Sequence, residues 1–153
     1  MRIEILLLSV VLLSVSYASK IKPTVDWVIS FEQCSHNSIW TMHGLWPDPN
    51  NFCEGEDFDI SQIESIRSEM DTYWISCPVF DWSNEELWAH EWSKHGTCSG
   101  LTQLGYFSRA LKLRPRYIPY CDETTTTECE ICLYTNQTFN HYGNCGFGPN
   151  PSM

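Results

Sequence analysis

The segment SNEELWAHEWSKHGTC (residues 83–98) decides most of the fold prediction, because it combines a helix start with a cluster of polar side chains. Ser83 followed three residues later by Glu86 is the signature of a capping box, in which the two residues satisfy each other's backbone N–H groups. The segment therefore predicts a helix that opens at Ser83 and continues to about Lys94.

The rest of the sequence predicts three strands and an exposed loop. The β-branched and aromatic run Val25–Gln33 predicts a strand, and so do Ile39–Met42 and Glu130–Thr135. The second strand leads into His43-Gly44-Leu45-Trp46-Pro47, and Pro47 is expected to end its pairing. An exposed loop is expected at Thr124–Thr127.

Two more helices follow from helical spacing of apolar residues. Asp59 with Gln62 predicts the start of the first, whose apolar positions are Ile60, Ile63, Ile66, Met70 and Trp74. The other is expected to stop at Pro115, after the apolar positions Tyr106, Phe107, Ala110, Leu111 and Leu113. Strands and helices are segregated rather than alternating, so the predicted fold class is α+β.

Four polar side chains project from about one and a half turns of the helix in residues 83–98. His90 and Lys94 share one face, and Glu91 and His95 share the neighbouring one. A satisfied surface or capping cluster is the alternative interpretation. Burying so many ionisable groups in a core would be costly, and their clustering favours a functional site to which His43 also contributes.

A zinc site of the metalloprotease type does not fit this cluster. That motif places two histidines four residues apart with a glutamate between them. Here the two histidines are His90 and His95, five residues apart, and Lys94 stands at the ligand position. An ammonium group there opposes a dication, whereas a lysine among histidines suits a phosphate. No metal or cofactor is therefore expected.

The first residues and the cysteines predict export. Residues 1–18 have a charged start, a short apolar centre and small residues at Ser16 and Ala18, as in a secretory signal peptide. The apolar run is too short for a membrane anchor. Eight cysteines indicate disulfides and an oxidising compartment, and Asn136-Gln137-Thr138 is a glycosylation sequon. Residues 19–153 are expected to form one domain.

The charge alone does not suggest a nucleic-acid partner. The net charge is −10, with only nine Lys and Arg residues. Nucleic-acid binding ordinarily leaves a basic footprint. The conflict eases in an acidic compartment, where carboxylates are partly neutralised and histidines are charged. The expected location is therefore outside the cell or in an acidic, lysosome-like or vacuolar lumen.

Two segments closely resemble the ribonuclease T(2) family of secreted acid ribonucleases. Trp40-Thr41-Met42-His43-Gly44-Leu45-Trp46-Pro47 is similar to its first active-site segment. His90-Glu91-Trp92-Ser93-Lys94-His95-Gly96-Thr97-Cys98 is similar to its second. The resemblance implies an antiparallel sheet flanked by helices, and cleavage of single-stranded RNA through a 2′,3′-cyclic phosphate to 3′-phosphate ends, with little base specificity.

The resemblance also implies the role of each site residue. His95 would take the proton of the 2′-hydroxyl, and His43 would protonate the leaving 5′-oxygen. His90 would hold phosphate, while Glu91 and Lys94 would stabilise the transition state. A monomer without metal is expected.

Two tryptophans have two open interpretations. Trp46 and Trp88 would be platforms on which bases stack, or plain core residues.

The family also suggests two disulfides. Cys53 and Cys98 match one bridge of the family, and Cys132 and Cys145 match another. Among the other four cysteines, the pairs Cys34–Cys77 and Cys121–Cys129 stay open, because sequence does not fix connectivity.

The resemblance is incomplete. The strand Trp27–Gln33 runs almost directly into Cys34, where the family has a disulfide-closed loop. After Leu111 the chain is shorter than the family by several tens of residues. The alternative function is therefore a catalytically inactive secreted relative, or a disulfide-stapled interaction protein that keeps the motifs by descent.

Overall fold

We describe the protein from a computed structural model, which describes residues 26–35, 38–48, 51–121, 127–135 and 139–145. The expected signal peptide at residues 1–18, the sequon at Asn136 and most of the loop at Thr124–Thr127 lie outside the described residues. No helix in the described ranges is long and apolar enough to cross a bilayer.

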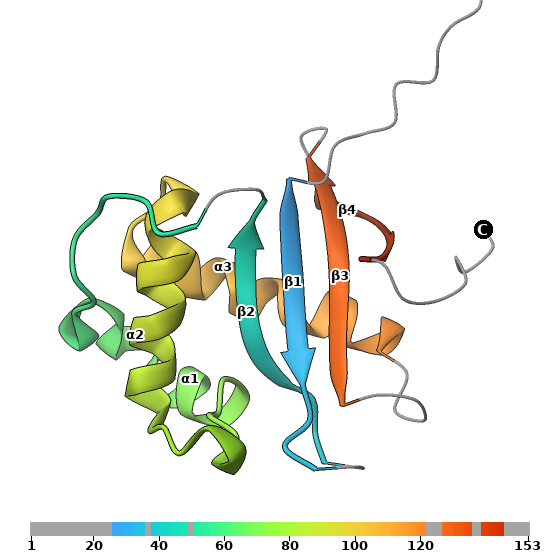
Figure 1. Cartoon of the computed structure of the whole chain (residues 1–153), viewed down its shortest axis with the longest axis horizontal. Coiled ribbons are helices and arrows are strands. Elements are labelled where there is room, and N and C mark those ends of the chain that lie inside the picture. The colour runs from blue at the N-terminus through green and yellow to red at the C-terminus, as the bar shows by residue number, and fades with distance from the viewer. Residues whose placement is uncertain (1–25, 36–37, 49–50, 122–126, 136–138, 146–153) are drawn as a thin grey trace, which may run out of the picture.

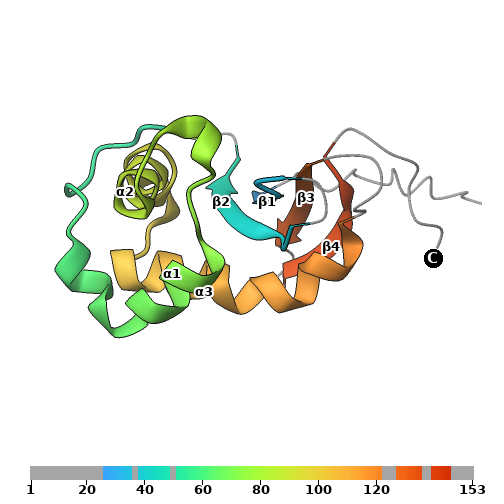
Figure 2. The ribbon, with the colours of Figure 1, turned by 90° about the horizontal axis from the view of Figure 1, so that it is seen from below.

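The fold is an antiparallel sheet with helices beside it and on one face (Figures 1 and 2). The strands are β1 (Trp27–Glu32), β2 (Thr41–Pro47), β3 (Glu128–Thr135) and β4 (Phe139–Asn144), in the order β2-β1-β3-β4. The helices are α1 (Arg67–Tyr73), α2 (Asn84–Lys94) and α3 (Gln103–Tyr117). The α+β prediction is therefore confirmed, with α3 running under the sheet in Figure 2 and α2 lying beside β2 in Figure 1.

The core lies between the sheet and the helices. Ile29 and Phe31 of β1 point into it, and the intervening Ser30 points to the opposite face, as strand alternation requires. The aromatic side chains that fill the core are Trp74, Trp88, Trp92, Tyr106, Phe107 and Tyr117. One face of the sheet is thus packed, which leaves the other available for a site.

Helix α2 begins as the capping box predicts. The Ser83 hydroxyl accepts from the Glu86 N–H, and the Glu86 carboxylate accepts from the Ser83 N–H. The helix ends at Lys94, also as predicted, with His95 at its C-cap.

The helix predicted after Asp59 needs correction. The segment expected to form one helix after Asp59 is a 3₁₀ helix, Ile60–Ile66, followed by α1. Its isoleucines recur every three residues, which is the 3₁₀ period. Asp59 does cap it, but through the Ser61 N–H rather than with Gln62.

Of the two prolines expected to end an element, Pro47 does so and Pro115 does not. Helix α3 continues past Pro115 to Tyr117. The proline removes one N–H, and the buried Tyr117 side chain continues the apolar face, so packing offsets the loss. Strand β2 continues from Met42 through its motif and ends at Pro47, as predicted, with Pro47 opposite Trp27 at the last position of the register.

All eight cysteines form disulfides. The bridges Cys53–Cys98 and Cys132–Cys145 form as the resemblance implies. The remaining cysteines take the two pairings that the sequence left open, Cys34–Cys77 and Cys121–Cys129.

Candidate active site

The side chain of His43 owes its position to an irregularity in β2. Ser30 of β1 pairs with Gly44 and the next residue, Phe31, pairs with Met42, so that His43 is the extra residue of a β-bulge. Bulges re-aim side chains and are frequent next to active sites. Here the bulge lets Met42, on one side of His43, reach the core while the imidazole stays half-buried at the surface.

The second half of the site lies at the C-terminal end of α2. Glu91 is 1% exposed and His95 is 5% exposed, whereas His90 and Lys94 are half-buried. The His95 N–H donates to the Glu91 carbonyl over 3.0 Å, so the last helical turn fixes the two residues relative to each other. The Nδ1 atom of His95 is buried and has no hydrogen-bond partner in the described part of the chain.

Trp46 joins the two halves. Its ring stacks on His95 with centroids 5.2 Å apart and meets His43 edge-on at 5.3 Å. Its indole N–H donates to Glu91 Oε2 over 2.8 Å. The structure therefore brings residues from the two sequence segments together around one indole.

The two histidines differ in their electrostatic surroundings. Burial, together with the nearby Lys94, His90 and His43, lowers the pKa of His95 to about 3. Burial also lowers the pKa of His43, where the carboxylate of Glu128 opposes the shift. His95 is thus held neutral, and His43 is the histidine with a nearby negative charge to stabilise its imidazolium.

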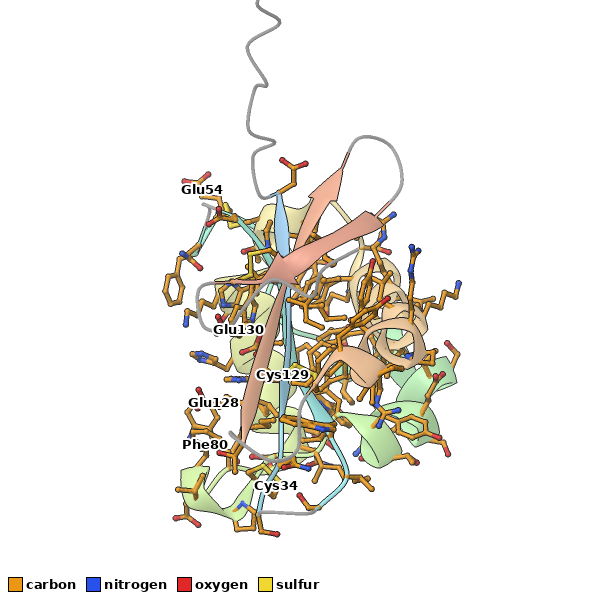
Figure 3. The ribbon with its side chains drawn as sticks, turned by 90° about the vertical axis from the view of Figure 1, so that its right-hand side faces the viewer. Cys34, Glu54, Phe80, Glu128, Cys129 and Glu130 are labelled. Atoms are coloured by element: carbon orange, nitrogen blue, oxygen red, sulfur yellow. A yellow bond between two sulfur atoms is a disulfide. The ribbon has the colours of Figure 1, made fainter. Side chains whose placement is uncertain are left out.

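Carboxylates beside the site are held back from ionising. Burial raises the pKa of Glu91 to about 7 against the opposing hydrogen bond from Trp46. Burial and the nearby Glu128 raise the pKa of Glu32 to about 7 as well. Glu32 pairs directly with Glu128 across β1 and β3, while Glu130 pairs with Ser30, so these acidic side chains share one face of the sheet. Figure 3 shows Glu128 and Glu130 on the side of the sheet away from Cys129.

An aromatic rim beside the site was not predicted from the sequence. Phe80 and Trp82 are each 42% exposed, with ring centroids 6.2 Å apart. Phe80 lies 6.4 Å from the His43 ring, and Trp82 lies 5.1 Å from that of His90. Figure 3 shows Phe80 on the same side as Glu128. The only signal in the sequence is two aromatic residues in the short loop after Cys77, which has no periodicity.

Of the two tryptophans considered as base platforms, Trp88 lies in the core. It is fully buried, and its indole N–H donates to the Trp74 carbonyl over 2.8 Å. It has no face on which a base could stack, so the core interpretation replaces the platform for this residue. Trp46 remains half-buried at the site.

Comparison with known proteins assigns the chain to a family. The sequence profile of the Ribonuclease T2 family matches residues 17–127. The chain belongs to the ribonuclease T2 family. Ribonuclease MC of Momordica charantia is 40% identical over 85 residues, which are 51% of this chain and 44% of that protein. Human ribonuclease T2 is 38% identical over 80 residues, or 48% of this chain and 31% of that protein.

Solved structures of the ribonuclease T2 type agree with this assignment. Ribonuclease MC1 from the seeds of bitter gourd superposes with a TM-score of 0.52 and 29% identity, over 60% of this chain and 57% of that one. The S-like ribonuclease trichomaglin superposes with a TM-score of 0.58 over 82% of this chain and 93% of that one. At 18% identity, the second likeness supports the fold alone. The matches span less than half the length of the two curated relatives named above.

Proposed function

We propose that this protein is a secreted, metal-independent endoribonuclease that cleaves single-stranded RNA through a 2′,3′-cyclic phosphate. The observation that carries the proposal is the placement of His43 and His95 against the same Trp46 indole. Two imidazoles on either side of one site can supply the base and the acid that RNA transphosphorylation needs. RNA itself supplies the nucleophile, its 2′-hydroxyl.

The environments of the two histidines support a division of roles. His95 takes the 2′-hydroxyl proton, because its lowered pKa leaves it neutral at every pH above about 3. His43 donates a proton to the leaving 5′-oxygen, and Glu128 favours its charged form. Water then opens the cyclic phosphate with the roles exchanged, which gives a 3′-phosphate end.

The remaining candidate residues act on charge. Lys94 and His90 lie on the accessible face of α2 and stabilise the negative charge that develops on the phosphate. The buried Glu91 completes the set through its hydrogen bond with Trp46. Among the described residues, no group of three His, Cys, Asp or Glu side chains is placed to hold a metal ion.

The aromatic rim supports low base specificity. Every base has a π-face, so stacking on Phe80 and Trp82 would be sequence-tolerant. Among the structural relatives, a mutant of ribonuclease MC1 is in complex with 5′-GMP, and ribonuclease NT is in complex with 5′-AMP. Nucleotide binding in these relatives supports RNA as the partner of this chain.

Export to an oxidising, acidic compartment completes the proposal. Every cysteine is disulfide-bonded, which is typical of exported proteins. An acidic medium reduces the repulsion between RNA and a chain of net charge −10.

Purified protein incubated with RNA at mildly acid pH in excess EDTA tests the proposed activity. We expect cleavage, with cyclic-phosphate termini detected by mass spectrometry of the fragments. Cleavage that requires added metal would contradict the mechanism, and the absence of any cleavage would favour an inactive relative.

A further inference from the structure

The positive charges of the chain are concentrated on helix α3. The sequence has no Asp or Glu between Trp92 and Cys121, a stretch that carries five of the nine Lys and Arg residues. Four of these five lie in α3, at Arg109, Lys112, Arg114 and Arg116. A chain of net charge −10 therefore contains a long helix that carries positive side chains and no negative one.

Three of these cations share one face of α3. Arg109, Lys112 and Arg116 follow one another at spacings of three and four residues, which aligns them along an α-helix. We call these three residues the basic row. Lys112 and Arg116 are exposed, and Arg109 is half-buried. Arg114 points elsewhere, because its guanidinium donates to the Trp40 carbonyl over 2.7 Å.

A hollow of about 360 Å³ opens beside the basic row. The described residues that line it all belong to α3 and are Gly105, Ser108, Arg109, Lys112 and Leu113. Gly105 has no side chain and that of Ser108 is small, so the hollow lies between them and the two long cationic side chains. Two cations beside a hydroxyl group suit an anionic ligand, and phosphate above all.

The basic row and the acidic side chains of the sheet lie on opposite sides of the molecule. Glu32, Glu128 and Glu130 occupy the sheet face beside His43, whereas α3 covers the other face (Figures 2 and 3). Exposed charges farther apart than a Debye length of about 8–10 Å are largely screened from each other. The basic row therefore attracts phosphate locally, although the whole chain is acidic.

We propose that the basic row of α3 is a second RNA-binding surface, which holds backbone phosphates of a long single strand away from the bond that is cut. The inference rests on the proposed function and deepens it, because it explains how an acidic ribonuclease retains a polyanionic substrate. Contacts of Lys and Arg with phosphate carry no base information, so this surface adds affinity without base specificity. A substrate short enough to fill only the catalytic site does not reach α3.

The double variant Lys112→Gln/Arg116→Gln tests the surface. Both side chains are exposed, and neither makes an ion pair within the described ranges, so the variant should keep its fold. The matched control is Gln62→Glu/Ser65→Glu, at two exposed positions of the 3₁₀ helix Ile60–Ile66. Each double variant lowers the net charge by two, and only the first removes cations from α3.

Binding is measured with a fluorescent 2′-O-methyl RNA of about 20 nucleotides, by anisotropy at mildly acid pH and several salt concentrations. The probe has no free 2′-hydroxyl, so the wild-type protein is used unaltered. We expect Lys112→Gln/Arg116→Gln to raise the Kd about 10-fold at low salt and to lower the slope of log K against log salt by about 1.4, because each phosphate contact with a single strand contributes about 0.7. The control variant should stay within about twofold of the wild-type Kd and keep its slope.

Cleavage kinetics separate this surface from the catalytic site. For a long RNA, the KM of Lys112→Gln/Arg116→Gln should rise about 10-fold with kcat unchanged, because the lost contacts are the same in the ground state and the transition state. For a ribodinucleotide, both constants should keep their wild-type values. The control variant should match the wild type on both substrates.

Absence of probe binding by the wild type, or the same Kd and salt slope in wild type and Lys112→Gln/Arg116→Gln, would overturn the proposal. So would an equal loss of binding in the control variant, which would mean that net charge alone is responsible. Vesicles that contain anionic lipid give the last comparison. If Lys112→Gln/Arg116→Gln lost binding to them but not to RNA, the basic row would be a membrane surface. A protein that binds the probe through the basic row and cleaves no RNA would disprove the proposed function and leave this surface standing.

Discussion

Replacing Cys53 and Cys98 together by alanine removes the disulfide that ties the two halves of the site. The bridge closes a separation of 45 residues and joins the chain after β2 to the turn that follows His95. Next to it, the Phe52 N–H donates to the Lys94 carbonyl over 2.7 Å, which fixes the same loop against the end of α2. Loss of the bridge should therefore reduce both stability and activity.

The magnitude follows from loop closure. In the chain-entropy model a loop of this length contributes about 4 kcal/mol, and the loop of 8 residues between Cys121 and Cys129 contributes about 2.5 kcal/mol. For a domain of this size we expect a fall of roughly 10–20 °C in the thermal midpoint of the Cys53/Cys98 variant, with most activity lost. Alanine at Cys121 and Cys129 should cost less stability and leave most activity, because that bridge lies away from the catalytic segments.

Calorimetry and RNA cleavage on the two double variants, with peptide mapping of the wild type, check this prediction. An equal fall in the thermal midpoint of both variants would contradict the ranking. Near-wild-type activity without the Cys53–Cys98 bridge, or a free Cys53 in the peptide map, would show that the bridge does not hold the site together.

Three further predictions concern titratable residues. His43→Ala and His95→Ala should each lower the cleavage rate by about 10²–10⁴-fold without unfolding the protein. The control variants His36→Ala and His141→Ala should leave the rate nearly intact. A near-wild-type turnover of His95→Ala would exclude His95 as the base. The cleavage rate should be bell-shaped in pH with an acidic optimum. On the acid side His95 becomes active as pH rises through its pKa of about 3, and on the other side His43 loses its proton at a pKa below its ordinary 6.5. A rate that still rises above about pH 8 would contradict this profile. Glu32 has a pKa raised from 4.5 to about 7, so the unfolded chain releases that proton first and stability should fall as pH rises between these values. Denaturant unfolding of Glu32→Gln should show a smaller fall over that window, and an identical fall would mean that Glu32 is not responsible.

A local signal in the sequence was sufficient to predict the start of α2, the helix beside the site. The capping box at Ser83 and Glu86 depends on residues three apart, so it predicts the start of α2 without tertiary information. The Ile60–Ile66 segment shows the limit of such signals, because isoleucines three residues apart fit one face of an α-helix as well as the 3₁₀ helix that forms. Pro115 shows another limit, since burial of Tyr117 outweighs a local helix breaker.

The geometry of the site depends on contacts between distant segments. The bulge at His43 exists only in the pairing of β2 with β1, and no periodicity within β2 predicts it. Trp46 and Trp88 look alike in the sequence, yet one holds the site and the other lies in the core, because burial is set by what packs against each. The acidic face likewise appears only once the register places Glu32 opposite Glu128.

In the proposed mechanism the RNA 2′-hydroxyl is the nucleophile, activated by His95. The most direct test uses a DNA oligonucleotide with one ribonucleotide, beside an otherwise identical oligonucleotide that carries a 2′-O-methyl group at that position. At mildly acid pH with EDTA, the protein should cut only after the ribonucleotide and leave a 2′,3′-cyclic phosphate, and His95→Ala should not cut either strand. Cleavage of the 2′-O-methyl strand, or fragments that end in a 3′-hydroxyl, would contradict the mechanism.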